Sequence, residues 1–80
     1  MRSIDELKRR IIAERIRNDA FALNGPTGDE QYVMSSDGNR EWSVYYYERG
    51  LRSSQRTFAS EAEACDELLR RLLRDPTTRI

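Results

Sequence analysis

The chain has 80 residues, which is enough for one small domain but not for a second hydrophobic core. Its 14 basic residues balance its 14 acidic residues, so the zero net charge provides no global field that would attract nucleic acid or anionic lipid. Thirteen of the basic residues are arginine, whose planar guanidinium suits protein and phosphate partners alike.

The single cysteine, Cys65, has no partner for an intramolecular disulfide, which is typical of a reducing compartment. No apolar run approaches the roughly 20 residues that span a bilayer, and residues 1–6 lack the apolar core of a secretion signal. We therefore expect a cytoplasmic protein. Cys65 falls on a leucine-rich helical stripe, where we expect a small buried hydrophobe rather than a nucleophile.

A first helix is predicted over about residues 4–18. Ser3 and Glu6 have the spacing of a capping box, in which each side chain bonds a free amide at the helix start. Apolar side chains follow at steps of three to five residues and predict one buried face. They are Ile4, Leu7, Ile11 and Ile16.

Glycine and proline divide the middle of the chain. Residues 24–30 contain Gly25, Pro26 and Gly28 and are predicted to form a loop. The short apolar segment before it, residues 21–23, is either a short edge strand or an anchored turn. Strands are predicted over about residues 31–35, 40–47 and 52–58. Asp37-Gly38 supplies a tight turn between the first two strands, and Glu48-Arg49-Gly50 turns the chain into the third.

Alternation along the middle strand separates two sets of side chains. Trp42, Val44 and Tyr46 lie on one face, and Ser43, Tyr45 and Tyr47 lie on the other. We expect the first set to face the core and the second set to lie on an uncovered sheet face. The sequence does not decide which face of residues 52–58 is buried, because this strand has little apolar content.

Residues 61–74 are predicted to form a second helix. Ser60 and Glu63 repeat the capping-box spacing, and Pro76 stops the helix. Apolar pairs recur every four residues between them, at Ala64/Cys65, Leu68/Leu69 and Leu72/Leu73. The sequence therefore predicts one α+β domain over residues 1–80, of order α-(β)-β-β-β-α, in which two helices cover one face of a small antiparallel sheet.

The chain contains no recognisable catalytic constellation. It has no histidine, so the commonest general base and metal ligand is absent, and one cysteine cannot build a thiolate zinc site. Its four glycines fit neither a phosphate-binding loop nor a dinucleotide fingerprint. We predict a protein that is not an enzyme and that has no catalytic, cofactor-binding or metal-binding residues.

The sheet face predicted to be uncovered is the candidate for partner binding. Aromatic side chains beside arginine are enriched at protein interfaces. The predicted contact residues are Tyr45, Tyr47, Glu48, Arg49 and Arg52. Two alternatives stay open. The tyrosines can simply stabilise the sheet as cross-strand pairs, or Arg49, Arg52 and Arg56 can contact nucleic-acid phosphates. The oligomeric state and the identity of the partner are open as well.

Several motifs resemble small bacterial immunity proteins, the partners of polymorphic or contact-dependent toxins. They are Trp42-x-Val44-Tyr45-Tyr46-x-Glu48-Arg49-Gly50, Phe58-x-Ser60-Glu61-x-Glu63-Ala64-Cys65 and Arg74-Asp75-Pro76, with Asn24-Gly25 and Tyr32 before the sheet. The resemblance implies a cytoplasmic protein that binds and blocks a toxin domain without chemistry of its own. Many nuclease-neutralising proteins are strongly acidic and this chain is not, which argues against a nuclease as the target.

A second resemblance competes with the first. Three strands followed by a helix, with Trp42 in the middle strand and residues 58–60 leading into the helix, are similar to integrase arm-binding and AP2-like DNA readers. That resemblance implies DNA reading by the open sheet face. The double-stranded-RNA-binding fold shares the element order, but Glu61 and Glu63 replace its lysine-rich helix start. We therefore prefer a protein-binding module and keep an AP2-like nucleic-acid module as the alternative.

Overall fold

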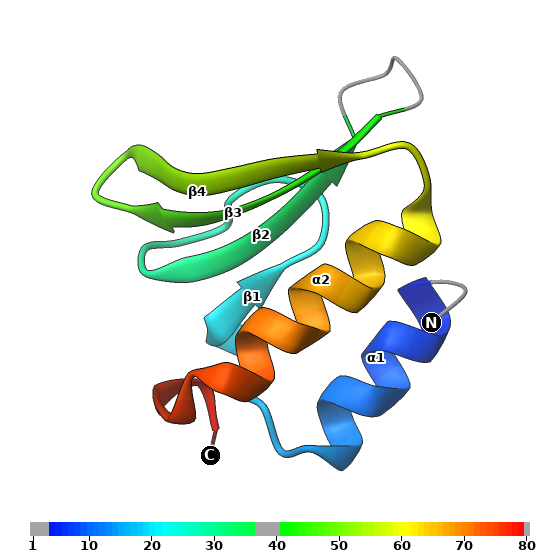
Figure 1. The fold of residues 1–80 in the computed structure, drawn as a ribbon. Helices are drawn as coiled ribbons and strands as arrows, with labels where there is room; N and C mark the ends of the chain where they lie inside the picture. Colours follow the sequence, from blue (N-terminus) through cyan, green and yellow to red (C-terminus); the bar gives the residue numbers. More distant parts are fainter. Residues whose placement is uncertain (1–3, 37–40, 80) are drawn as a thin grey trace.

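The structure, a computed structural model, describes residues 4–36 and 41–79. Its elements are the α-helices α1 (Ile4–Ala13) and α2 (Glu61–Arg74), the 3₁₀ turns η1 (Asn18–Ala20) and η2 (Pro76–Thr78), and the strands β1 (Phe21–Ala22), β2 (Gln31–Ser36), β3 (Trp42–Glu48) and β4 (Leu51–Phe58). The predicted α+β class is confirmed. Figure 1 shows both helices on one side of the sheet, with α2 between the sheet and α1. Two predicted features, the cap at Ser3 and the turn at Asp37-Gly38, lie outside the described residues.

The sheet has the strand order β1-β2-β3-β4. The pairs β2–β3 and β3–β4 are antiparallel, but β1 pairs parallel to β2, with Phe21 opposite Tyr32 and Ala22 opposite Val33. The expectation of a wholly antiparallel sheet is therefore wrong. The connection 23–30 returns behind the strands, on the side away from α2, so the chain enters β2 in the direction of β1 (Figure 1). The choice left open for residues 21–23 is resolved as a two-residue edge strand.

Helix α1 ends five residues before the predicted position. Arg15 adopts a left-handed conformation with φ +57°, which ends an α-helix. Its amide donates to the carbonyl of Ile12, and the amide of Ile16 donates to the carbonyl of Ile11, both at 3.1 Å. This pair of bonds is a Schellman motif, and it folds Ile16 back onto Ile11 in the core. The apolar stripe continues through Ile16, but the helix does not.

Helix α2 begins and ends where the sequence predicts. The Ser60 hydroxyl accepts from the amide of Glu63 at 3.2 Å, so the predicted serine cap forms, and it donates to the Glu63 carboxylate at 3.1 Å. Leu68 and Leu72 are fully buried, and Cys65 is buried in the same core, as predicted. Burial raises the pKa of the Cys65 thiol to about 11, because desolvation disfavours the thiolate.

The main core lies between the helices and the inner face of the sheet. It joins Leu7 and Ile11 of α1 with the leucines of α2 and with Met34 and Val44 of the sheet. Trp42 packs against this cluster, so the predicted inward orientation is confirmed for Trp42 and Val44, whereas Tyr46 is half-buried and outside the cluster. A second, smaller cluster lies on the opposite face, where Ala22, Val33 and Tyr45 form a row across three strands.

Because a left-handed residue at a helix end favours glycine, replacing Arg15 should stabilise the protein. We expect Arg15→Gly to raise the free energy of unfolding by about 1 kcal/mol. The matched control, Lys8→Gly, places glycine at an exposed site inside α1 and should lower it by about 1 kcal/mol. Urea denaturation followed by circular dichroism measures both, and a loss of stability in Arg15→Gly would contradict the assignment of the helix end.

Candidate functional site

The hairpin formed by β3 and β4 extends past the helices as an arm (Figure 1). Its two-residue turn, Arg49-Gly50, has positive φ angles of 52° and 78°, as a primed hairpin turn requires. Residues 51–57 are all exposed, and the Leu51 side chain is 73 % exposed at the end of the arm. Arg49 and Arg52 are exposed, whereas Tyr47 and Glu48 are half-buried.

Tyr45 is the one predicted contact residue that the structure removes from the surface. Its side chain is fully buried on the sheet face opposite the helices, beside Val33 and Ala22. The guanidinium of Arg52 lies over its ring at 4.7 Å from the centroid, a cation–π contact. The expectation of an uncovered sheet face is therefore wrong at Tyr45, although its assignment to the outer face is right. Tyr47 packs against the edge of this cluster.

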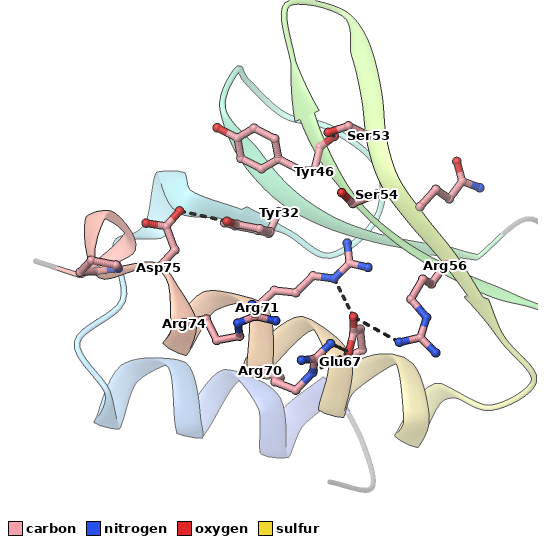
Figure 2. Close-up of a pocket in the computed structure, with 12 residues that line it drawn as sticks. Tyr32, Tyr46, Ser53, Ser54, Arg56, Glu67, Arg70, Arg71, Arg74 and Asp75 are labelled. Carbon is pink, nitrogen blue, oxygen red and sulfur yellow. Dashed lines mark hydrogen bonds and ion pairs between the residues drawn. The ribbon is translucent and has the colours of Figure 1, made fainter.

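A cleft of about 680 Å³ opens between the C-terminal half of α2 and the strand β4. Figure 2 shows its walls. The basic lining residues are Arg56 from β4 and Arg70, Arg71 and Arg74 from α2. The acidic lining residues are Glu67 and Asp75, so the cleft carries two more positive than negative charges. Tyr32 and Tyr46 form its aromatic wall, with ring centroids 4.9 Å apart.

Glu67 forms ion pairs with three of the arginines that line the cleft. Its carboxylate is 7 % exposed and accepts from Nε and Nη2 of Arg70 at 2.9 and 2.7 Å and from Nε of Arg71 at 2.8 Å. Arg56 approaches the same carboxylate at 4.0 Å. Burial alone would raise the pKa of Glu67, but the hydrogen bonds from Arg71 and Arg70 outweigh it and hold the pKa below its ordinary value.

Tyr32 and Asp75 close the other end of the cleft. The Tyr32 hydroxyl donates to Oδ2 of Asp75 at 2.9 Å, and burial together with this bond raises the pKa of Tyr32 to about 12. The second oxygen of Asp75 accepts from the amide and the hydroxyl of Thr77 at 3.0 and 2.7 Å. These bonds from Thr77, with the smaller contribution of Tyr32, lower the pKa of Asp75. Asp75 is therefore a carboxylate fixed by its neighbours.

A β-bulge shapes the strand side of the cleft. Val44 pairs with Arg56 and Tyr46 pairs with Ser53, so two residues of β4 lie opposite Tyr45. One of them, Ser54, has a positive φ of 54°. Such a bulge bends its strand and redirects the side chains beside it. Arg56 follows directly and points toward the cleft in Figure 2.

Sequence reasoning missed the cleft. In the sequence, Tyr32 and Arg74 are identified only as parts of motifs, and no functional role is assigned to Glu67, Arg70 or Arg71. Their spacing contained a signal, since residues at steps of three, four and seven share one helix face. The predicted set and the cleft share no residue, although Arg56, named for the nucleic-acid alternative, does line it.

Two further observations concern the part of the chain that the structure describes. Within residues 4–36 and 41–79, no three acidic, cysteine or histidine side chains gather into a metal-binding group. Over the same residues, no helix has the length and apolar character to cross a membrane.

No protein family matches the chain, and no curated protein or solved structure is significantly similar to it. The resemblance to immunity proteins, the AP2-like alternative and the role of the hairpin in partner binding therefore stay predictions.

The Tyr45 hydroxyl is buried and has no hydrogen-bond partner among the described residues, which is unfavourable for a polar group. We expect Tyr45→Phe to raise the free energy of unfolding by about 1 kcal/mol, because it removes this unpaired hydroxyl. The matched change Tyr32→Phe deletes a paired hydroxyl and should lower it by about 1 kcal/mol. Thermal denaturation tests both, and destabilisation by Tyr45→Phe would reveal a hidden partner of the hydroxyl.

The lowered pKa of Glu67 links stability to pH. A carboxyl whose pKa is lower in the folded state stabilises the fold above its unfolded pKa, near 4.5, and the contribution is lost as pH falls through the lowered pKa. Glu67→Gln should therefore lower the free energy of unfolding by about 1–2 kcal/mol at pH 7. The difference from the unmodified protein should shrink towards pH 3. Urea titrations at both pH values measure it, and a constant difference would contradict the role of the charge.

Proposed function

We propose that this protein is a binding module without chemistry of its own, and that its ligand is another protein. The observation that carries the proposal is the arm formed by β3 and β4, which extends past the helices with every residue from 51 to 57 exposed. Leu51, at its end, is 73 % exposed and offers an apolar side chain to a partner. We call the exposed or half-buried residues of this end the arm surface: Tyr47, Glu48, Arg49, Leu51 and Arg52.

The turn of the arm supports this proposal. Arg49 occupies the first position of a primed turn, where asparagine, aspartate or glycine fits with less strain. Its left-handed backbone disfavours a long side chain by about 1 kcal/mol. A residue that is unfavourable locally is expected where its side chain has a use. Tyrosine and arginine are also the residues that dominate the energetics of protein interfaces.

The resemblance to immunity proteins suggests the kind of partner. On that proposal, the protein binds a toxin domain in the cytoplasm and blocks it by occupying its surface, with the arm surface as part of the contact. The zero net charge of the chain disfavours a strongly basic nuclease as the partner. Loss of Tyr45 from the predicted set reduces the aromatic contact area but leaves Tyr47, Glu48, Arg49 and Arg52 accessible.

The AP2-like alternative is less favoured by the same geometry. Stacking on nucleic-acid bases needs an open aromatic face, and Tyr45 is fully buried. Arg49, Arg52 and Arg56 are all exposed and keep the phosphate contacts of that alternative available. Nucleic acid is therefore an outcome that the experiment must be able to reveal.

The first experiment is capture of partners by the tagged protein from nuclease-treated host lysate at physiological salt, with identification by mass spectrometry. We expect one specific protein to be retained. Retention of nucleic acid without nuclease, and of no protein with it, would support the alternative instead. Recovery of neither would contradict the proposal.

A variant pair then tests the arm surface against the captured protein. Arg49→Asn removes the guanidinium while placing a favoured residue in the turn, and Leu51→Thr removes the exposed apolar side chain while keeping a strand-forming residue. Together they should weaken binding by at least about tenfold, as measured by calorimetry. The control Ile12→Gln removes another large exposed apolar side chain, which is 75 % exposed on α1, and should leave affinity unchanged. Unchanged affinity of the double variant would exclude the arm surface.

A further inference from the structure

We propose that the cleft between α2 and β4 binds a carboxylate group of an acidic segment in the partner protein. This inference rests on the proposed function, because it names the part of the partner that is recognised and a second contact site for it. Arg56 and Arg74 are the residues assigned to the incoming carboxylate, and Tyr46 is assigned to the aliphatic part of the segment.

The first argument is the balance of charges in the cleft. Four guanidinium groups face two carboxylates there. Glu67 is already bonded by Arg70 and Arg71, and Asp75 is already bonded by Tyr32 and Thr77. Arg74 has no hydrogen-bond or ion-pair partner among the described residues, and Arg56 has a 4.0 Å approach to Glu67 and a contact with the Phe58 ring, 5.5 Å from its centroid, but no hydrogen bond among those residues. The cleft thus has donors for an anion that the chain itself does not supply.

The second argument is that part of this basic wall is already ordered. The Arg71 side chain is only 11 % exposed, and its guanidinium is fixed by Glu67 on one side and by the carbonyl of Val44, at 3.4 Å, on the other. Arginine has five N–H donors, so donors of Arg71 stay available after these two bonds. A fixed guanidinium loses little side-chain freedom on binding, which favours affinity for a planar carboxylate.

The third argument concerns the kind of anion. A cleft with two carboxylates of its own and an excess of only two positive charges offers little attraction to a long polyanion. Tyr46 is half-buried, and with Tyr32 it gives one side of the cleft an aromatic surface that packs against aliphatic carbons. The volume of the cleft, about 680 Å³, is that of a pocket for a small ligand or a few side chains. A glutamate or aspartate flanked by apolar residues matches all three properties.

The edge of β4 does not provide an equally good alternative in the same place. An exposed edge strand can bind a partner strand through backbone hydrogen bonds. The bulge at Ser54 interrupts the regular row of backbone groups beside the cleft, and Arg52 and Arg56 place charge along the strand. Recognition there is therefore assigned to side chains and not to strand addition.

The test is a nuclear magnetic resonance titration of the ¹⁵N-labelled full chain with an acetylated, amidated peptide of sequence Glu-Leu-Glu-Glu-Leu-Glu. We expect saturable shifts of the arginine Nε–H signals in the cleft and of the Tyr46 amide, with a dissociation constant on the order of 1 mM or below. The matched peptide with glutamine in place of every glutamate should produce no shifts. Arg56→Gln and Arg74→Gln should each weaken binding several-fold, and Arg9→Gln on α1 should not.

The same titration can overturn the inference. Absence of shifts with the glutamate peptide would overturn it. Shifts of the same size in the double variant Arg56→Gln with Arg74→Gln as in the unmodified protein would overturn it as well. Sodium phosphate and a 12-base-pair DNA duplex are the comparison probes, and shifts of the cleft signals by either of them without shifts by the peptide would assign the cleft to phosphate instead.

The failures of the two proposals are distinguishable. If a protein partner is captured and its affinity is unchanged in the double variant Arg56→Gln with Arg74→Gln, the inference about the cleft fails and the binding module stands. If the peptide binds the cleft but no protein partner is captured, the proposed function fails. Both side chains are exposed, so we expect the variants to fold. Circular dichroism verifies that they do.

Discussion

The carboxylate of Glu67 sets the spacing between α2 and β4. It lies on the helix face that is otherwise apolar, close to Leu68 and Ala64, and yet it is almost fully buried. A buried carboxylate needs hydrogen-bonded partners, and Arg70 and Arg71 supply them. Guanidinium groups of this size cannot be packed under a strand as leucine can. The helix therefore packs tightly on the inner face of β2 and β3 and leaves a cleft beneath β4.

This arrangement explains why β4 is so exposed. The apolar side chains of α2 that would cover a fourth strand are replaced by charged ones, and β4 itself is polar from Arg52 to Thr57. The strand is held in the sheet by its pairing with β3 and by Phe58, which packs against the main core at the far end. The fold thus leaves β4 accessible on both faces, with the cleft on its helix side and Arg52 of the arm surface over Tyr45 on the opposite side.

Sequence reasoning predicted the elements with strong local signals and failed where the decision is made by distant contacts. Helix α2 and the Arg49-Gly50 turn follow from a capping box and from turn chemistry. The end of α1 was missed because the left-handed position that ends the helix is occupied by an arginine, Arg15, and not by glycine, the usual sequence signal for a helix end. The assignment of alternating β3 side chains to the two sheet faces was correct. Whether the outer face is covered depends on the connection 23–30 and on Arg52, and the periodicity of β3 does not reveal these contacts. For the same reason Tyr45 was expected at the surface.

The strained positions of the backbone lie mostly near the proposed binding side. Among the described residues, four that are not glycine have positive φ: Arg15, Glu30, Arg49 and Ser54. Arg15 ends a helix, which is a structural use. Glu30 precedes Gln31, which pairs with Tyr47 of the arm surface, and Arg49 and Ser54 lie on the arm itself. Each such residue disfavours the fold by about 1 kcal/mol, and strain of this kind persists where the surrounding structure imposes it, often at functional sites. A chain of this length has little stability to spare. The concentration of these strained residues beside β4 is therefore a reason to look for the function at this edge of the sheet.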